Sequence, residues 1–178
     1  GTLMAAKKKI IWQDKLYQTL KKDLGVTQFA YVPDAGHKAI IDNSLSDKDV
    51  HSIALSTEEE GVGVAVGAWL GGERAALCVQ SSGVGNCVNF FSLNTNGRIP
   101  LLMLVSMRGD FGEANPWQVP MGQAVKPVCE ACGLTVLTCD YENEVVPTVQ
   151  AAGAMAFRSN QPMAVLLTQK LLGAKNFA

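Results

Sequence analysis

The chain has 178 residues, of which 48% are hydrophobic and 17% are charged, and its formal net charge is −1. This balance is typical of a compact globular domain and excludes an intrinsically disordered chain. A nearly neutral chain lacks the basic surface that phosphate backbones attract, so we expect no nucleic-acid partner. No apolar run reaches the ~18 residues that a membrane-spanning helix needs, so we expect no membrane segment.

The first half of the chain alternates amphipathic segments with short apolar runs. In chain order, we expect a helix over 10–24 that stops at Gly25, a strand over 27–32, a short helix capped by Asp34 and ending near Asp42, a strand over 51–55, and a helix from Ser56 or Thr57 to Leu70. Gly71 and Gly72 then end this last helix.

The second half continues the same alternation. We expect a strand over 75–80, a loop over 81–85, a helix over 86–94, a strand over 100–106, an irregular segment over 107–120, a helix over 121–132, a strand over 134–138, a helix over 143–158 and a strand over 163–168. The tail from Gln169 has no clear pattern.

Strands that alternate with helices imply right-handed crossovers and a parallel sheet that is covered on both faces. The strands are continuous apolar runs, as expected where both faces of a sheet are buried. We therefore predict an α/β fold, a three-layer α/β/α sandwich with about six mostly parallel strands. We expect a single domain over 10–175 and an N-terminal tail over 1–9, part of which reads as a remnant of cloning.

Five cysteines, an odd number, occur in apolar contexts, and no secretory signal precedes them. We therefore expect free thiols in a reducing cytoplasm. Cys129 and Cys132 have C-x-x-C spacing, but no second pair at suitable spacing follows, so we predict no metal site.

Ligands of such a sheet bind beyond the carboxyl ends of its strands, where we expect segments 32–37, 56–61, 80–86 and the one from Ser106. Glu58, Glu59 and Glu60 stand in a row at the start of a helix. Acidic residues there are ordinarily surface partners of the helix dipole. The rest of this helix is almost wholly apolar, so we expect it to be buried nearly all round, and a carboxylate at its start then needs a partner. A structural and a functional role both stay open.

The segment 81–86 could bind a phosphate through its backbone N–H groups. It has neither the Gly-Lys-Ser/Thr of a Walker loop nor a complete dinucleotide fingerprint, so a simple tight turn explains it equally well.

Together these motifs resemble the N-terminal, pyrimidine-binding (Pyr) domain of thiamine-diphosphate enzymes. Glu59-x-Gly61 is followed ten residues after Glu59 by an aromatic, Trp69. The more specific similarity, over about residues 10–175, is to the alpha subunit of sulfopyruvate decarboxylase and to phosphonopyruvate decarboxylase. It rests on Val32-Pro33-Asp34, Glu58-Glu59-Glu60-Gly61-Val62-Gly63, Ser82-Gly83-x-Gly85-Asn86, Ser106-Met107-Arg108-Gly109 and Trp117-Gln118-Val119-Pro120-Met121-Gly122.

The resemblance implies that Glu59 hydrogen-bonds the aminopyrimidine ring of thiamine diphosphate and activates the cofactor, which acts as an electron sink for loss of carbon dioxide. If Glu59 is partly buried, its pKa is expected to be raised. The resemblance also implies further contacts with the cofactor from the segment after the third strand, namely from Gln80, Ser82, Gly83, Val84 and Asn86.

The family holds the diphosphate and Mg²⁺ with a second domain that carries a Gly-Asp-Gly motif, and this sequence has none. The resemblance therefore implies a separate beta chain with that PP domain, which holds Mg²⁺, in an α2β2 or larger hetero-oligomer. It implies no metal ligand in this chain, and it leaves open whether 107–120 closes over the site.

The segment with Asp34 and His37 resembles the family's substrate-facing loop. A protonated His37, or Arg108, could face the second anionic group of a small 2-oxo acid. The alternatives are a solvated His37 in the first turn of a helix and a structural ion pair at Arg108. For His51, inside a strand, a core position is the simpler interpretation.

The leading hypothesis is a subunit of a decarboxylase, with sulfopyruvate, giving sulfoacetaldehyde and carbon dioxide, ahead of phosphonopyruvate. A carboligating enzyme with the same cofactor stays open. So do a non-catalytic Pyr-like module for assembly or regulation and a flavodoxin-like nucleotide-binding domain. The presence of Glu59 disfavours the non-catalytic module, because an assembly role needs no acid there.

Overall fold

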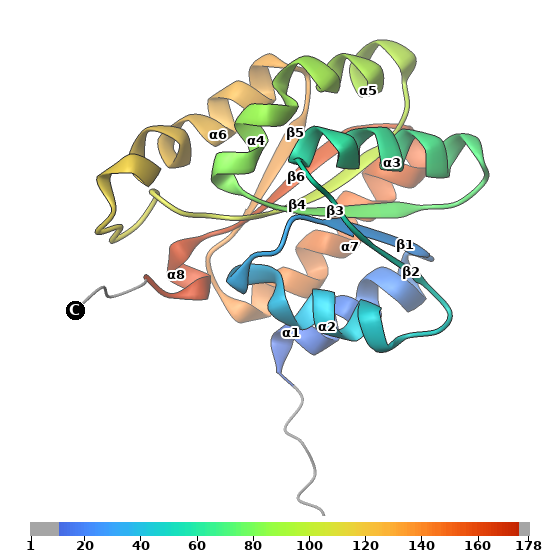
Figure 1. Cartoon of the computed structure of the whole chain (residues 1–178), viewed down its shortest axis with the longest axis horizontal. Coiled ribbons are helices and arrows are strands. Elements are labelled where there is room, and N and C mark those ends of the chain that lie inside the picture. Colours follow the sequence, from blue (N-terminus) through green and yellow to red (C-terminus); the bar gives the residue numbers. More distant parts are fainter. Residues whose placement is uncertain (1–10, 175–178) are drawn as a thin grey trace, which may run out of the picture.

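Six strands form one sheet in the order β2-β1-β3-β4-β6-β5, and every neighbouring pair is parallel (Figure 1). The structure, a computed structural model, describes residues 11–174, so the tail expected over 1–9 lies outside the described residues. The strands are β1 (Gln28–Tyr31), β2 (His51–Ala54), β3 (Ala75–Gln80), β4 (Leu101–Ser106), β5 (Thr135–Cys139) and β6 (Pro162–Leu167).

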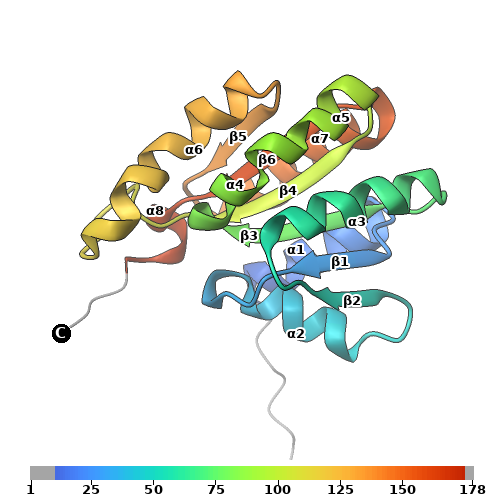
Figure 2. The ribbon, with the colours of Figure 1, turned by 45° about the horizontal axis from the view of Figure 1, so that its top comes forward.

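Helices cover both faces of the sheet, which confirms the predicted three-layer sandwich. One layer contains α1 (Trp12–Gln18), the π-helical turn η1 (Thr19–Asp23), α2 (Lys38–Ser46) and α7 (Glu142–Ser159). The other contains α3 (Glu58–Leu70), α4 (Ser81–Cys87), α5 (Phe91–Gly97) and α6 (Val119–Ala131), which cover one face in Figure 2. The short helices are η2 (Ala35–His37), η3 (Val88–Phe90), η4 (Pro116–Gln118) and α8 (Gln169–Leu172).

The apolar strands explain why the sheet needs both layers. In β4, Leu102 and Leu104 pack into the core on the α7 side, whereas Leu101, Met103 and Val105 pack into the core under α3 to α6. Because alternate side chains of a strand point to opposite faces, a strand that is apolar at every position must be covered twice. Among the described residues, no helix has both the length and the apolarity that crossing a membrane requires.

The prediction of a loop over 81–85 is wrong, because α4 begins at Ser81, directly after β3. Serine and glycine disfavour a helix when they are considered alone. At Gly83, however, a Cβ atom would lie 2.4 Å from Cγ of Glu58, so the missing side chain is what lets α3 and α4 approach. The close packing of α3 against α4 therefore explains why a glycine stands at position 83 inside a helix.

The expectation that α3 is buried nearly all round is also wrong. Gly63, Gly67 and Leu70 lie on its exposed side, and Leu70 is 74% exposed. The helix packs on β1 and β3 with its other side, where Val62 and Ala65 are buried. Packing within the described part of the chain therefore does not explain why this side of α3 is apolar.

Two smaller differences concern helix ends. The short helix expected to end near Asp42 continues to Ser46, and the side chain of Asp34 caps η2 in front of it by accepting from the Gly36 N–H. Thr57 occupies the N-cap position of α3, but its side chain makes no capping bond. The tail from Gln169, for which no pattern was found, forms α8.

Candidate functional site

Parallel strands bring four polar segments to one edge of the sheet. Asp34 follows β1, the three glutamates follow β2, Gln80 ends β3, and Arg108 follows β4. Sequence reasoning therefore placed these residues at the correct edge. They separate into two groups, one around Asp34 and one at the start of α3.

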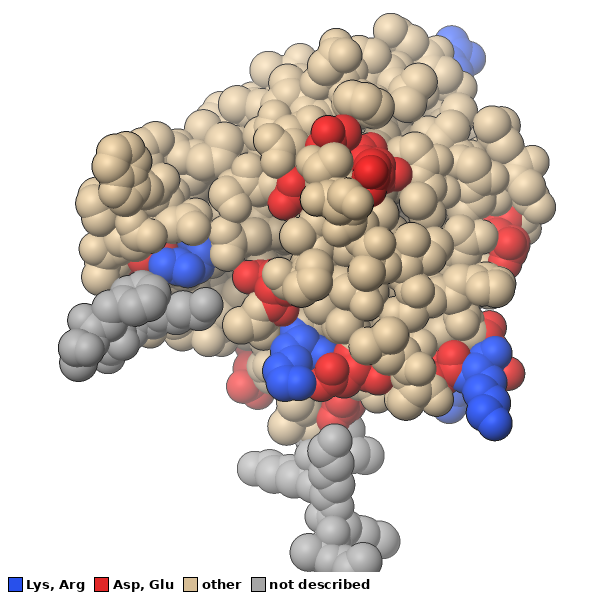
Figure 3. Space-filling view, viewed as in Figure 1, with Lys and Arg blue, Asp and Glu red and all other residues tan. Residues whose placement is uncertain are grey.

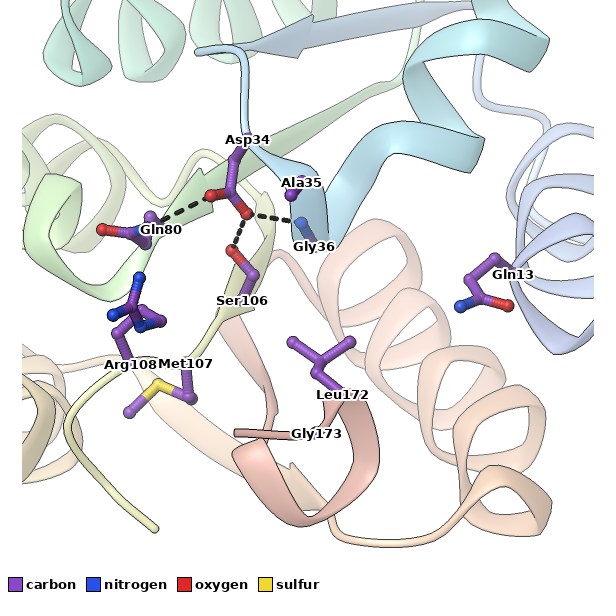
Figure 4. A pocket seen from close by; sticks show the side chains of 10 residues that line it. All are labelled: Gln13, Asp34, Ala35, Gly36, Gln80, Ser106, Met107, Arg108, Leu172 and Gly173. Carbon is purple, nitrogen blue, oxygen red and sulfur yellow. Dashed lines mark hydrogen bonds between the residues drawn. The ribbon is translucent and has the colours of Figure 1, made fainter. Parts of the chain in front are cut away.

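The carboxylate of Asp34 is the centre of the first group (Figure 4). One oxygen accepts from the Ser106 hydroxyl at 2.6 Å and from the Gly36 N–H at 2.9 Å, and the other accepts from the Gln80 amide at 3.1 Å. Burial, the largest single influence on the pKa of Asp34, acts to raise it. The hydrogen bonds from Ser106, Gly36 and Gln80 and the nearby His37 together outweigh burial, so the pKa lies below its ordinary value. Asp34 is therefore an anion at neutral pH.

A cavity of about 170 Å³ opens beside Asp34. It lies where the ends of β1, β3 and β4 meet α8, and Figure 4 shows the side chains around it. The lining residues are Gln13, Asp34, Ala35, Gly36, Gln80, Ser106, Met107, Arg108, Leu172 and Gly173. Of these, Asp34 and Arg108 carry charge, so the lining combines one anion with one cation.

Arg108 makes a two-point ion pair. Its Nε lies 2.5 Å and its Nη2 2.8 Å from the two carboxylate oxygens of Glu113, and both side chains are largely buried. This pairing raises the pKa of Arg108 and lowers that of Glu113. The structural ion pair considered from the sequence is therefore present, and the same side chain also lines the cavity.

His37 lies in the core and not at the surface of the cavity. It is 1% exposed, and its Nε2 donates to the carbonyl of Val79 at 3.0 Å. Burial lowers the pKa of the imidazole, so the ring is neutral at pH 7. Neither expectation for His37 fits this position, because a protonated ring at the substrate and a solvated ring both require access to water.

At the start of α3, the three glutamates have three different partners. Glu58 accepts from the Asn86 amide at 2.8 Å and lies against Gly83. Glu60 accepts from the Ser56 N–H at 2.9 Å. Glu59 accepts from the hydroxyl of its neighbour Thr57. Glu58 therefore braces two helices and Glu60 closes the helix start, whereas Glu59 is held only locally.

The pKa of Glu59 is lowered, not raised as expected. The main cause is the hydrogen bond that the Thr57 hydroxyl donates to the carboxylate. Glu59 is partly buried, as the expectation assumed, but burial raises its pKa less than the hydrogen bonds from the Thr57 hydroxyl and from its own main-chain N–H lower it. Figure 3 shows the acidic side chains over the start of α3 at the surface, with no basic side chain beside them.

The residues expected to contact the cofactor divide into two sets. Gln80 accepts from the Ser82 hydroxyl at 2.7 Å and from the Gln118 amide at 3.3 Å, and Ser82 and Asn86 are exposed. Gly83 and Val84 are buried, and Val84 belongs to the core. A ligand at this edge can therefore reach the side chains of Gln80, Ser82 and Asn86, whereas Val84 is fully buried and offers it no exposed atom.

Sequence reasoning missed the residues that hold the segment after β4. Glu113 and Gln169 hydrogen-bond each other at 3.0 Å although 56 positions separate them. Glu113 stands in an irregular stretch and Gln169 in a tail without periodicity, so neither gave a signal. Within the part of the chain that the structure describes, no group of three or more His, Cys, Asp or Glu residues could hold a metal ion.

No protein-family model matches the chain. The chain is 36% identical over 146 residues to sulfopyruvate decarboxylase subunit alpha of Methanococcus maripaludis, and the alignment covers 82% of this chain and 87% of that protein. It is 31% identical to the subunit alpha of Methanocaldococcus jannaschii, over 85% of this chain and 89% of that protein. The phosphonopyruvate decarboxylase of Streptomyces viridochromogenes is 32% identical, but the alignment covers only 38% of it.

Among solved structures, a 2-oxoglutarate:ferredoxin oxidoreductase from Magnetococcus marinus is similar, with a TM-score of 0.74 over 92% of this chain and 29% of that chain. At 13% identity this similarity confirms the fold alone. The resemblance stated from the sequence is confirmed by the curated relatives. The chain belongs to the family of the sulfopyruvate decarboxylase alpha subunits.

Proposed function

We propose that this chain is the alpha subunit of a split, thiamine-diphosphate-dependent decarboxylase that converts sulfopyruvate to sulfoacetaldehyde and carbon dioxide. The observation that carries the proposal is the 36% identity to a named alpha subunit over 82% of the chain. The length of this alignment and the presence of Glu59 at the start of α3 make a purely structural module the weaker explanation.

The side chains at the start of α3 fit the aminopyrimidine half of the cofactor. An aminopyrimidine presents ring nitrogens and an amino group, which need a carboxylate and amide or carbonyl partners. Glu58 and Glu60 are engaged by Asn86 and Ser56, so Glu59 is the carboxylate that would share a proton with a ring nitrogen. When bound, thiamine diphosphate accepts the electron pair that the departing carboxylate leaves behind.

A second chain would complete the site. The described residues offer no metal-binding cluster for a diphosphate with Mg²⁺. The cavity supplies Asp34 and Arg108, and Arg108 is already paired with Glu113, so a substrate with two negative charges needs further cations. These observations support a PP-domain beta subunit that holds Mg²⁺ and contributes positive charge. An α2β2 or larger assembly rests on the family resemblance.

Asp34 and Arg108 are the residues that we assign to the substrate side, because both line the cavity. His37 is left out of this set, since it is buried and neutral. The cytoplasmic location stays a prediction of the sequence, and the five unpaired cysteines support it. Phosphonopyruvate is the second candidate substrate, because a phosphonopyruvate decarboxylase is 32% identical to this chain.

The test is the release of carbon dioxide from sulfopyruvate and from phosphonopyruvate with thiamine diphosphate and Mg²⁺. The assay uses this chain alone, the candidate beta chain alone, and the mixture. We expect activity only in the mixture, and a higher kcat/KM for sulfopyruvate than for phosphonopyruvate. Activity of the isolated chain would contradict the split site, and an inactive mixture with both acids would contradict the decarboxylase.

A further inference from the structure

Gln80 ends β3 at the border of the cavity, where its side chain meets Asp34. Both residues line the cavity, and the Gln80 amide donates to Oδ1 of Asp34 at 3.1 Å, a bond that Figure 4 shows. Asp34 follows β1, which is the neighbour of β3 in the sheet, so the bond joins the ends of two adjacent strands. Gln80 is therefore in direct contact with the one acid of the cavity lining.

The partners of Gln80 fix the orientation of its amide. An ionised carboxylate only accepts hydrogen bonds, so the amide nitrogen of Gln80 has to face Asp34. The amide oxygen of Gln80 then points to the other side, where it accepts from the Ser82 hydroxyl at 2.7 Å and from the Gln118 amide at 3.3 Å. The donors thus run in one direction, toward the carboxylate, and donors that polarise an amide strengthen the bond that this amide donates. Ser82 and Gln118 do not line the cavity, but Gln80 connects them to its acid.

Gln80 holds the oxygen of Asp34 that has capacity for a further partner. The other oxygen, Oδ2, accepts from the Ser106 hydroxyl at 2.6 Å and from the Gly36 N–H at 2.9 Å. Among the described residues, Gln80 is the hydrogen-bond donor to Oδ1. A carboxylate oxygen accepts about two hydrogen bonds, so a proton or a hydrogen bond from a ligand adds at Oδ1. The position of Oδ1 therefore decides how Asp34 meets a ligand.

The proposed reaction needs a proton at the cavity. When a 2-oxo acid becomes an aldehyde, carbon dioxide leaves without the electron pair of the broken bond, and the carbon left behind takes up one proton, which water ultimately supplies. The charged residues of the lining are Asp34 and Arg108, and a guanidinium does not release its proton. A substrate with two negative charges favours the protonated form of a neighbouring carboxylate. Asp34 is therefore the charged lining residue that can pass on a proton, provided that Oδ1 points to the reacting carbon.

We propose that Gln80 is a positioning residue, which orients Oδ1 of Asp34 toward the reacting carbon, and that Gln118 acts on the same oxygen through Gln80. This inference rests on the proposed function, and it assigns Gln80 to the substrate side and not to the cofactor. Gln118 stands in η4, so the segment after β4 helps to set the geometry of an acid that follows β1. The alternatives are a direct contact of Gln80 with the cofactor and a purely structural role.

The three roles differ in what a second substitution does. Gln80→Met keeps the length of the side chain and removes its hydrogen bonds. If Gln80 acts through Asp34, Gln80→Met has little further effect once Asp34 is replaced by asparagine. If Gln80 holds the cofactor or stabilises the fold, the two effects multiply. The comparison therefore needs Gln80→Met, Asp34→Asn and the double variant, each in the mixture with the beta chain.

Gln28→Met is the matched control. Like Gln80, Gln28 is a half-buried glutamine whose amide donates to a carboxylate, that of Glu73 at 3.0 Å. Gln28 begins β1, so it lies at the opposite edge of the sheet from Asp34. The control removes the same kind of hydrogen bond without touching the cavity.

We expect Gln80→Met to lower kcat by about tenfold, the equivalent of one hydrogen bond to a charged group. KM for sulfopyruvate and the half-saturating concentration of thiamine diphosphate should change by less than about twofold. In the Asp34→Asn background, Gln80→Met should change kcat by less than about twofold, and Gln28→Met should do so in either background. A double variant whose kcat falls by the product of the two single effects overturns the inference. So does a Gln80→Met variant that changes only the half-saturating concentration of thiamine diphosphate.

A second readout does not depend on activity. NMR titration of the Asp34 carboxyl in the isolated chain should show a higher pKa in Gln80→Met, because the amide of Gln80 stabilises the ionised form, and no change in Gln28→Met. His37 and Arg108 also act on Asp34 electrostatically, and none of these substitutions replaces them. An unchanged titration of Asp34 in Gln80→Met overturns the inference, even where Asp34→Asn abolishes activity.

Gln118→Met tests the second part of the inference. It leaves the bond between Gln80 and Asp34 in place and removes a donor to the amide of Gln80, so kcat and the pKa of Asp34 should shift in the same directions as in Gln80→Met, but less. If Gln80→Met does not fold, Gln118→Met takes its place in the cycle with Asp34→Asn. An inactive wild-type mixture overturns the proposed function and this inference with it, whereas an active mixture in which the effects multiply overturns only the positioning role.

Discussion

Two regions at the same edge of the sheet differ in how fully their polar side chains are hydrogen-bonded within the chain. Around Asp34, nearly every polar atom has a partner within the chain, and the network extends from Ser106 and Gln80 to Gln118. At the start of α3, the Glu59 carboxylate is held locally, by the Thr57 hydroxyl and by its own main-chain N–H. The first region is preorganised by its own hydrogen bonds, whereas the second presents a partly exposed acid. The fold therefore fixes the side chains around Asp34 more fully than those at the start of α3.

The sharpest test of this comparison replaces the three glutamates one at a time. Glu59→Gln should lower kcat of the mixture by a factor of about 100 or more, since loss of a proton-transferring group has that size. Its effect on the free energy of unfolding of the isolated chain should be small, because the carboxylate is partly exposed and bonds locally, to the hydroxyl of its neighbour Thr57. The measurements are carbon dioxide release and denaturant unfolding.

Glu60→Gln is the control for this series, since Glu60 is exposed and its carboxylate accepts from the Ser56 N–H. It should retain most of the activity. If Glu58→Gln or Glu60→Gln abolishes activity and Glu59→Gln does not, the assignment within the three glutamates is wrong.

The next largest effect is expected at Gly83. A Cβ there would lie 2.4 Å from Glu58 Cγ and 2.5 Å from Oε1, so Gly83→Ala must displace Glu58 and break its hydrogen bond to Asn86. We expect a loss of about 1–2 kcal/mol in the free energy of unfolding, after the gain in helix propensity is subtracted. Gly63→Ala is the control, because nothing lies within 4 Å of its Cβ. It should be neutral or stabilising, and equal losses in both variants would contradict the close packing.

Ser106→Ala tests the hydrogen-bond network around Asp34. The Ser106 hydroxyl donates to Asp34 at 2.6 Å, so its removal should raise the pKa of Asp34, which NMR titration can follow. A carboxyl with a lowered folded pKa stabilises the fold above its unfolded pKa, and this contribution is lost as the pH falls through the folded pKa. At pH 7 the variant should therefore be less stable by about 1 kcal/mol, a value reduced by solvent screening. The difference from wild type should shrink at acidic pH.

The control for this substitution is Ser46→Ala, which removes an exposed hydroxyl that bonds only to main-chain carbonyls of its own helix. A stability difference between Ser106→Ala and wild type that stays constant from pH 7 to pH 3 would show that Asp34 is not involved.

The smallest effect concerns His37. Because burial lowers the pKa of this histidine below its ordinary value of 6.5, the unfolded chain takes up a proton before the folded chain does. The fold should therefore lose stability as the pH falls below 6.5, by about 1.4 kcal/mol per pH unit at most for this one proton. His37→Gln should flatten this slope, which denaturant unfolding between pH 7 and pH 5 measures. A slope that stays unchanged in His37→Gln would remove His37 as the cause.

The elements that were predicted correctly are those whose own residue pattern identifies them. β3 was found with its observed bounds, and β4 within one residue, since strands buried on both faces are apolar at each position. The start of α4 was missed, because Ser81, Ser82 and Gly83 favour a turn unless the contact with Glu58 is known. This contact depends on how α3 and α4 approach each other, and the sequence pattern of either helix alone does not show that.

The same limit applies to the site. Asp34, Glu59, Gln80 and Arg108 were expected at this edge of the sheet, where the structure has them, because they follow strands or belong to a family motif. Their hydrogen-bond partners Glu113 and Gln169 were missed, because their proximity arises from segments that are distant along the chain. His37 was expected either to face the substrate or to be solvated in the first turn of a helix, but the η2 turn directs it into the core, to the carbonyl of Val79.

The cysteines give the molecule a convenient place for a probe. Burial raises the pKa of the Cys78, Cys87 and Cys129 thiols to about 12 and also raises that of Cys139, so a maleimide reagent reacts poorly with these four. Cys132 is half-buried and lies at the end of α6, just before β5. This is the opposite edge of the sheet from Asp34 and Glu59. A fluorophore attached there would report the formation of a complex without entering the cavity.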